Sequence, residues 1–176
     1  MSKLLPILFF CLVFIHCNSS GISGQDQVRQ LSSSEFDLLK NELKKYNFGQ
    51  IQDTIIIKYD YDRESCWNNL DQQTDEYIKT VISERQNFVL EEISKRKNLS
   101  FFHFKEPGNN FNKIISWDER VLTDTAGILK NLYFHKSNFC GNSAIILPDG
   151  KMIFIKSDAH FDALKWNQEK IRKVLN

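Results

Sequence analysis

Two cysteines, Cys66 and Cys140, are the side chains in this sequence best suited to covalent chemistry. A cysteine thiolate attacks disulfides, and a second cysteine can resolve the mixed disulfide that forms. Cys66 lies just before a predicted helix, where the helix dipole would lower the pKa of a thiol. The alternative is an inert disulfide that only stabilises the fold. Both interpretations require the two cysteines to lie close together.

A metal site is a further alternative for the same two cysteines. With His135 or His160 they would offer thiolate and imidazole ligands to copper or zinc. The two cysteines are widely separated in the sequence, unlike the closely spaced ligands of thioredoxin-like copper proteins. We therefore expect no metal and no other cofactor. His103 stands in an apolar stretch and is interpreted as a core or edge residue.

Three acidic residues, Asp60, Asp62 and Glu64, alternate along the end of a predicted strand. Side chains two positions apart share one face of a strand, so these carboxylates could bind a cation or form an acid–base pair. A strand end that faces solvent accounts for them equally well. Their spacing does not match a calcium-binding loop.

The N-terminus has the features of an export signal. Lys3 precedes an apolar run over residues 4–15. This run is too short for a membrane-spanning helix, which needs ~20 residues, but it fits the apolar region of a signal peptide. Cys17 follows, and then a polar stretch rich in serine and glycine. The arrangement resembles the lipidation site of bacterial lipoproteins, although His16 and Phe14 replace the small residue and the leucine usual there.

The lipoprotein resemblance implies that residues 1–16 are removed, that Cys17 carries acyl chains, and that residues 17–31 form a flexible tether. A single globular domain would occupy residues 32–176. The alternative is an ordinary signal peptide cleaved near Gly21 or Gly24, which gives a secreted or soluble periplasmic protein. Under the first interpretation the protein lies in the cell envelope, on the periplasmic side or the outer surface.

Export also bears on the cysteines. Of the four in the chain, Cys11 leaves with the signal and Cys17 is lipidated, so Cys66 and Cys140 remain. Disulfides persist outside the cytoplasm, and these two are expected to form one. In the chain-entropy model a loop of this length contributes about 4 kcal/mol to stability.

The composition supports a folded domain and argues against nucleic-acid binding. Hydrophobic residues make up 41% and aromatic residues 12% of 176 residues, which is sufficient for a core. The formal net charge is +1, and removal of residues 1–16 takes away only one charged residue, Lys3. A neutral domain without a basic patch is not expected to bind nucleic acid. The expected partners are the membrane, through the lipid anchor, and another envelope protein.

Hydrophobic periodicity predicts strands alternating with helices. The predicted helices cover residues 33–47, 74–97, 123–134 and 160–175. The predicted strands cover residues 54–62, 99–104 and 111–117, and a hairpin follows around Pro148-Asp149-Gly150. Residues 63–71 are predicted to be a polar turn. Proline, aspartate and glycine suit successive positions of a tight turn. These elements predict an α/β domain.

The order from the strand at residue 54 onward is βαβαββα, which resembles the thioredoxin fold. This resemblance implies a three-layer sandwich, here with an extra N-terminal helix; the alternative is an α+β domain with an antiparallel sheet. The thioredoxin fold carries its redox centre where the first strand meets the following helix, near the loop that precedes the hairpin. Cys66 and Cys140 occupy these two places, so the resemblance implies that they are neighbours.

The sequence departs from thioredoxin at two points. Asn69 stands where a Cys-x-x-Cys motif has its second cysteine, and Asn142-Ser143 stand where the family has a proline before the hairpin. We therefore predict a non-catalytic binding or scaffolding role in the cell envelope. The alternatives are a thiol–disulfide oxidoreductase that uses Cys66 and Cys140, and an inhibitor or immunity-type lipoprotein that binds one protein partner.

Overall fold

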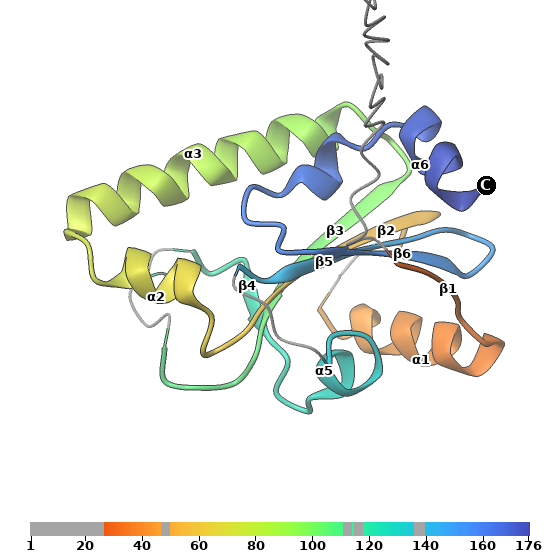
Figure 1. Cartoon of the computed structure of the whole chain (residues 1–176), viewed down its shortest axis with the longest axis horizontal. Helices are drawn as coiled ribbons and strands as arrows, with labels where there is room; N and C mark the ends of the chain where they lie inside the picture. Colours follow the sequence, from red (N-terminus) through yellow and green to blue (C-terminus); the bar gives the residue numbers. More distant parts are fainter. Residues whose placement is uncertain (1–26, 47–49, 111–113, 115–117, 136–139) are drawn as a thin grey trace, which may run out of the picture.

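The computed structural model describes residues 27–46, 50–110, 114, 118–135 and 140–176. These residues form a six-stranded mixed sheet with helices on both faces (Figure 1). The strands are β1 (Gln27–Gln30), β2 (Thr54–Asp60), β3 (Leu99–Lys105), β4 (Val121–Thr123), β5 (Asn142–Ile146) and β6 (Lys151–Lys156). The helices are α1 (Ser33–Lys44), α2 (Ser65–Asp71), α3 (Asp75–Ser94), α5 (Ile128–Leu132), the 3-10 helix η1 (Asp162–Lys165) and α6 (Gln168–Leu175).

The strand order across the sheet is β1-β6-β5-β2-β3-β4. Strands β2, β3 and β4 are parallel neighbours, whereas β5 is antiparallel to β2, and β6 and β1 continue that antiparallel pattern. The predicted mixture of helices and strands is confirmed, and the sheet is mixed rather than wholly antiparallel. This arrangement is consistent with the α+β class.

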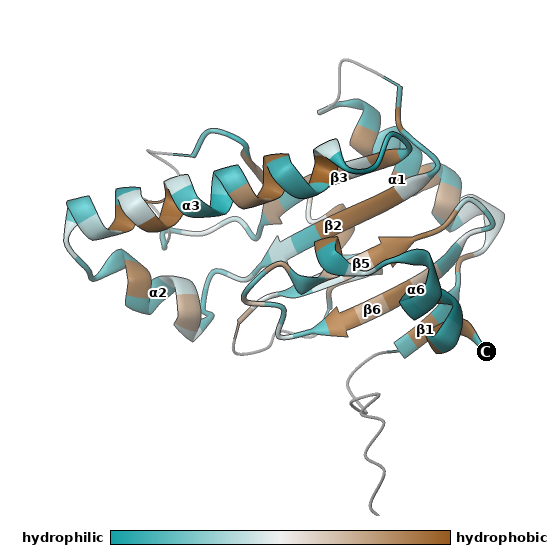
Figure 2. Ribbon diagram, turned by 90° about the horizontal axis from the view of Figure 1, so that it is seen from above, coloured by the Kyte–Doolittle hydropathy of each residue, from teal (hydrophilic) through white to brown (hydrophobic). Residues whose placement is uncertain are grey.

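Two apolar cores lie on opposite faces of the sheet. Helices α1 and α5 cover one face, where Leu39 and Leu129 pack on Ile57 and Tyr59. Helices α3 and α6 and the segment η1 cover the other face, where Ile78 packs in the second core. Figure 2 shows the apolar strands β2, β5 and β6 at the centre of the molecule. The side chains of the central strands are therefore buried on both faces.

Local sequence signals determine where α1 begins and where the chain turns between β5 and β6. Ser32 and Glu35 form a capping box at the start of α1, with the Ser32 N–H donating to Glu35 Oε2 at 2.9 Å. At the hairpin, Gly150 has φ +79° and its N–H donates to the Leu147 carbonyl at 2.9 Å. The predicted turn between β5 and β6 is confirmed.

The domain begins earlier in the chain than the sequence predicts. The predicted tether extends to residue 31, but Gln27–Gln30 form the edge strand β1, which pairs with β6. Leu31, directly after this strand, is buried. A polar segment can form an edge strand because only one of its sides pairs with the sheet.

Other elements differ in type or extent from their predictions. The predicted polar turn at 63–71 contains the helix α2, and the predicted helix at 160–175 is divided into η1 and α6. The predicted helix at 123–134 is reduced to α5, and β4 precedes it. Helix α2 forms because Trp67 packs into the core on the α3 side of the sheet. Hydrophobic periodicity over only seven residues cannot reveal such a tertiary contact.

Some predictions concern residues outside the described ranges. The signal peptide at 1–16, the lipidation site Cys17 and most of the strand at 111–117 are among them. Within the described ranges, no helix combines the length and the apolar composition needed to cross a membrane.

Candidate functional site

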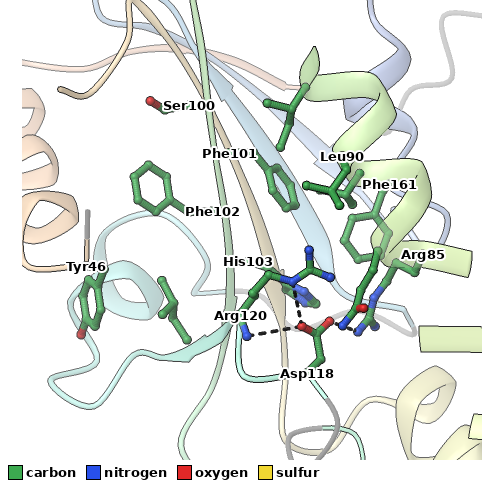
Figure 3. A pocket seen from close by; sticks show the side chains of 14 residues that line it. Tyr46, Arg85, Leu90, Ser100, Phe101, Phe102, His103, Asp118, Arg120 and Phe161 are labelled. Carbon is green, nitrogen blue, oxygen red and sulfur yellow. Dashed lines mark hydrogen bonds and ion pairs between the residues drawn. The ribbon is translucent and has the colours of Figure 1, made fainter. Parts of the chain in front are cut away.

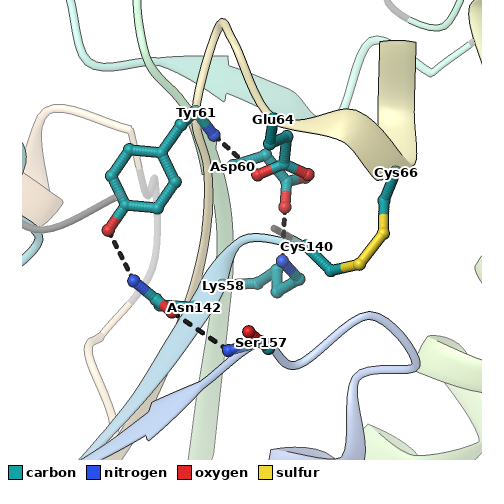
Figure 4. The surroundings of a disulfide bond; sticks show 8 residues. All are labelled: Lys58, Asp60, Tyr61, Glu64, Cys66, Cys140, Asn142 and Ser157. Carbon is teal, nitrogen blue, oxygen red and sulfur yellow. Dashed lines mark hydrogen bonds and ion pairs between the residues drawn. A yellow bond between two sulfur atoms is a disulfide. The ribbon is translucent and has the colours of Figure 1, made fainter. Parts of the chain in front are cut away.

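The candidate site is centred on a disulfide between Cys66 and Cys140. Cys66 lies in the first turn of α2, and Cys140 lies two residues before β5. The Cα atoms of the two cysteines are 5.1 Å apart, although 74 positions separate them in the sequence. Both residues are half-buried. The disulfide thus joins the segment after β2 to the segment before the hairpin (Figure 4).

A buried ionic group lies on the same face of the sheet as α3. Lys58 and Asp60 alternate along β2, with 1% and 2% of their surfaces exposed, and they form an ion pair. His103, directly across from Lys58 in β3, donates from Nε2 to Asp60 Oδ2 at 2.5 Å. Burying charged groups is costly unless they are paired and hydrogen-bonded, as these are.

The electrostatic surroundings keep Asp60 ionised and His103 neutral. Burial disfavours the charged form of Asp60, but the Lys58 ammonium and the hydrogen bond from His103 outweigh it and lower the pKa of Asp60. Burial is the main cause that lowers the pKa of His103. At neutral pH the group is therefore a Lys58–Asp60 ion pair to which a neutral imidazole donates.

Aromatic side chains cover this ionic group. The Phe161 ring meets His103 edge-on, with ring centroids 5.2 Å apart. Trp67 lies nearby as well, with its ring centroid 6.4 Å from that of His103. Arg85 of α3 places its guanidinium 4.6 Å from the Trp67 ring. These rings limit access of water and strengthen the electrostatic interactions beneath them.

Glu64 connects the two segments that carry the cysteines. It is 2% exposed and accepts a hydrogen bond from the Tyr61 N–H at 2.9 Å. Burial, together with the nearby negative charge of Asp60, raises the pKa of Glu64 to about 9. The positive charge of Lys58 and the backbone N–H groups of Tyr61 and Gly141 offset only part of that shift. Glu64 is therefore protonated at neutral pH, and its Oε1 has no hydrogen-bond partner in the described chain.

Gly141 allows the segment after Cys140 to approach the ionic group. Its φ is +59°, a backbone conformation that favours glycine. A Cβ at this position would lie 2.8 Å from the Tyr59 carbonyl oxygen and even closer to the side chains of Lys58 and Asp60. The next residue is held in place as well, because Asn142 Nδ2 donates to the Tyr61 hydroxyl at 2.6 Å.

The other predicted site residues lie elsewhere. Asp62 does not join Asp60 and Glu64; it accepts a hydrogen bond from the Asn110 N–H at 3.0 Å in a different loop. His135 and His160 are exposed. In the described ranges no three histidine, cysteine or acidic residues gather as metal ligands would. Of the aromatic residues near the predicted site, Trp67 covers the ionic group, whereas Tyr59 donates to Asp124 on the opposite face.

Sequence reasoning missed Lys58 and interpreted His103 as a core or edge residue without a role in the site. The available signal was the alternation of Lys58 and Asp60 with Tyr59 and Tyr61 in a strand whose first half is wholly apolar. Lys58 and Asp60 share one face of the strand and can pair there only if that face is buried. No significant match to this chain was found among protein families, curated proteins or solved structures.

Proposed function

We propose that this chain is an exported, lipid-anchored protein of the cell envelope, that its domain is a degenerate thioredoxin-like unit, and that its Cys66–Cys140 disulfide exchanges with the thiols of a partner protein. The observation that carries the proposal is the buried ionisable group beside the disulfide, made of Lys58, Asp60, Glu64 and His103.

The arrangement of the elements supports the thioredoxin-like assignment. From β2 onward, the chain forms a strand, two helices and a strand, then the short additional strand β4, then α5, a hairpin and a final helix, with helices on both faces of the sheet. The cysteines occupy the junction after the first of these strands and the segment before the hairpin. In the thioredoxin fold these two places form the redox centre. The absence of a Cys-x-x-Cys motif makes this a variant in which the second thiol comes from the far segment.

The buried ionisable group favours exchange over a purely structural disulfide. A structural disulfide requires only two cysteines in suitable geometry. Burying an ion pair and a protonated glutamate beside it costs stability, and apolar residues would fill the same volume at lower cost. Shifted pKa values in one cluster are a feature of reactive sites. A redox function accounts for the presence of this destabilising cluster, whereas a purely structural disulfide does not.

The exchange proceeds in two balanced steps. A thiolate of a partner dithiol attacks one sulfur of the Cys66–Cys140 bond; the bond breaks, and the other sulfur leaves as a thiolate that takes up a proton. The second thiolate of the partner then attacks the mixed disulfide, and the remaining cysteine of the chain is released and protonated. Two electrons pass from the partner dithiol to the chain, and the partner leaves as a disulfide.

Glu64 is suited to supply a proton in the first step. Its carboxyl group is protonated at neutral pH, and Glu64 lies two positions before Cys66 in the same segment (Figure 4). Because its Oε1 has no partner in the described chain, the proton is free to be donated to a departing thiolate. The negative charge of Asp60 favours retention of that proton until the bond breaks.

The proposed anchor would hold the domain close to a membrane. With Cys17 acylated, residues 18–26 would connect the lipid to β1, which begins at Gln27. Fully extended, a segment of that length spans about 30 Å. The partner of such a domain would be another envelope protein that presents a dithiol.

The test compares reduction of the disulfide in the folded and the unfolded chain. We would measure the second-order rate constant for reduction by dithiothreitol at pH 7, with and without urea. A redox-active disulfide should react at least about tenfold faster in the folded chain, because its site stabilises the departing thiolate. A folded chain that reacts more slowly than the unfolded chain would make the disulfide structural and end this proposal.

A further inference from the structure

A second site lies at the outer edge of β3, away from the disulfide. There a cavity of about 420 Å³ opens between α3, β3 and the segment that leads into β4 (Figure 3). It arises because β4 is short and pairs only with residues His103–Lys105. In the described part of the chain, residues 99–102 of β3 have no strand beside them on that edge.

One end of the cavity is apolar. Val89, Leu90 and Ile93 of α3 lie on the same side of β3 as Phe101, whereas Phe102 lines the cavity from the opposite face of the strand. Leu90 is 56% exposed, which is unusual for a large aliphatic residue next to an available core. The size is within the range of about 300–1,000 Å³ typical of small-molecule sites, which are mostly apolar with a few polar groups.

The other end of the cavity is polar and carries a surplus positive charge. Figure 3 shows Arg85, Asp118 and Arg120 gathered there. Asp118 accepts from Arg85 at 2.6 Å and from Arg120 Nε at 3.2 Å. Asp118 is buried, but the two arginines outweigh burial and lower its pKa, so two cations face one carboxylate. His103 also lines the cavity, and burial lowers its pKa, so it adds no charge at neutral pH.

Donors also exceed acceptors at this end. Arg120 uses its Nε and its backbone N–H on Asp118, and its Nη1 and Nη2 have no recorded partner among the described residues. Arg85 Nη1 is buried and has no acceptor among the described residues. The buried, unpaired donor of Arg85 is costly, and an incoming anionic oxygen would relieve that cost, whereas the Arg120 side chain is 45% exposed and supplies charge rather than a desolvated donor.

We propose that this cavity binds a small amphipathic carboxylic acid, with the carboxylate at Arg120 and the apolar body between α3 and the edge of β3. One negative charge balances the surplus cation, and the apolar end accepts an acyl chain or an aromatic ring. The cavity shares His103, Phe161 and Arg85 with the surroundings of the ionic group, but the proposed binding does not require disulfide exchange.

Calorimetric titration of the purified full-length chain tests the proposal. The probes are octanoate, 4-phenylbutyrate and 1-octanol, of which the alcohol has an apolar body but no charge. One or both acids should bind saturably at one site, and the alcohol should bind at least about tenfold more weakly than octanoate. Preference for octanoate identifies an acyl ligand, and preference for 4-phenylbutyrate an aromatic one. No saturable binding of either acid, or equal binding of octanoate and octanol, would overturn the proposal.

Two variants distinguish the contribution of the ligand's carboxylate to binding from that of its apolar part. Arg120→Gln should weaken binding of the acid about tenfold and leave octanol binding unchanged; Arg120 is 45% exposed, so the variant should fold. Leu90→Gln should weaken binding of both the acid and the alcohol. Arg172→Gln, an exposed arginine of α6, is the matched control and should bind like the original chain. Unchanged acid binding in Arg120→Gln would refute the assigned orientation of the ligand.

Discussion

At the scale of single residues, Glu64 lies two positions before Cys66 and contacts the backbone of both segments that the disulfide joins. Its position combines burial with a nearby negative charge, and both effects retain its proton. A glutamate ionises near 4.5 when unfolded, whereas this one holds its proton to about 9. As the pH rises, the unfolded chain therefore releases this proton before the folded chain does. The contribution of Glu64 to the free energy of unfolding consequently falls as the pH rises from 4.5 to about 9.

Replacing Glu64 with glutamine should remove this dependence. Between pH 5 and pH 9 the free energy of unfolding of the original chain should fall relative to Glu64→Gln, by at most about 1.4 kcal/mol per pH unit. Urea denaturation of the oxidised proteins at pH 5, 7 and 9 measures this difference. Glu119→Gln, at an exposed position, is the control and should follow the original chain. Parallel profiles for Glu64→Gln and the original chain would contradict the account.

The sequence identifies some of these residues and conceals the roles of others. Cys66, Cys140, Asp60 and Glu64 were recognisable because thiols and alternating carboxylates are conspicuous. The placement of His103 opposite Lys58 depends on the register between β2 and β3, which local sequence does not specify. The same dependence on tertiary contacts explains why Asp62 was grouped with the site although it bonds to Asn110.

At the scale of elements, the segment before β5 is shaped by its approach to β2. Gly141 has a positive φ, and it packs against the side chains of Lys58 and Asp60. Gly127, which precedes α5, has a similar φ of +65° but much more space, since the nearest atom to an added Cβ would be Asn131 Nδ2 at 3.5 Å. Substitution at Gly127 therefore tests backbone strain alone, whereas substitution at Gly141 tests backbone strain together with a steric collision.

Alanine at these two positions should have different costs. Gly127→Ala should lower the free energy of unfolding by about 1–2 kcal/mol, the strain of a left-handed residue. Gly141→Ala should cost at least about 3 kcal/mol, because the added methyl group also displaces the buried ion pair. Urea denaturation of both variants measures these costs. Equal costs would show that Gly141 is needed only for its backbone conformation.

Element prediction succeeded where the sequence pattern was long and failed where tertiary contacts decide. The 20-residue helix α3 and the β5–β6 hairpin follow from their periodicity and turn residues. The short helix α2 was predicted as a turn because its stability comes from Trp67 packing in the core and from the disulfide. Strand β1 has only four residues, of which three are polar, so nothing in its pattern distinguishes it from a tether.

At the scale of the whole molecule, the proposed lipid anchor would hold the proposed redox-active domain close to the membrane through a short tether. Cys17→Ser should prevent acylation and release the protein from the membrane fraction after cell disruption, whereas the original chain should require detergent. Cys11→Ser, a change within the proposed signal peptide, is the control and should remain with the membrane. The same distribution for Cys17→Ser and the original chain would contradict the lipid anchor.

The disulfide also determines how the whole molecule responds to reduction. It joins the segment after β2 to the hairpin across 74 positions, so in the chain-entropy model its loss costs about 4 kcal/mol. A redox-active domain must tolerate that loss and stay folded when reduced. The two extensive cores on both faces of the sheet are the features that make this possible.

The central claim, that Cys66 and Cys140 form an exchangeable pair, is tested most directly by the reduction potential of their disulfide. The protein would be equilibrated in graded dithiol–disulfide buffers, its free thiols trapped, and its fold followed in the same samples. We predict a midpoint above about −270 mV with the fold retained on reduction. A midpoint below about −300 mV, or reduction only when the protein unfolds, would identify a structural disulfide and contradict the account.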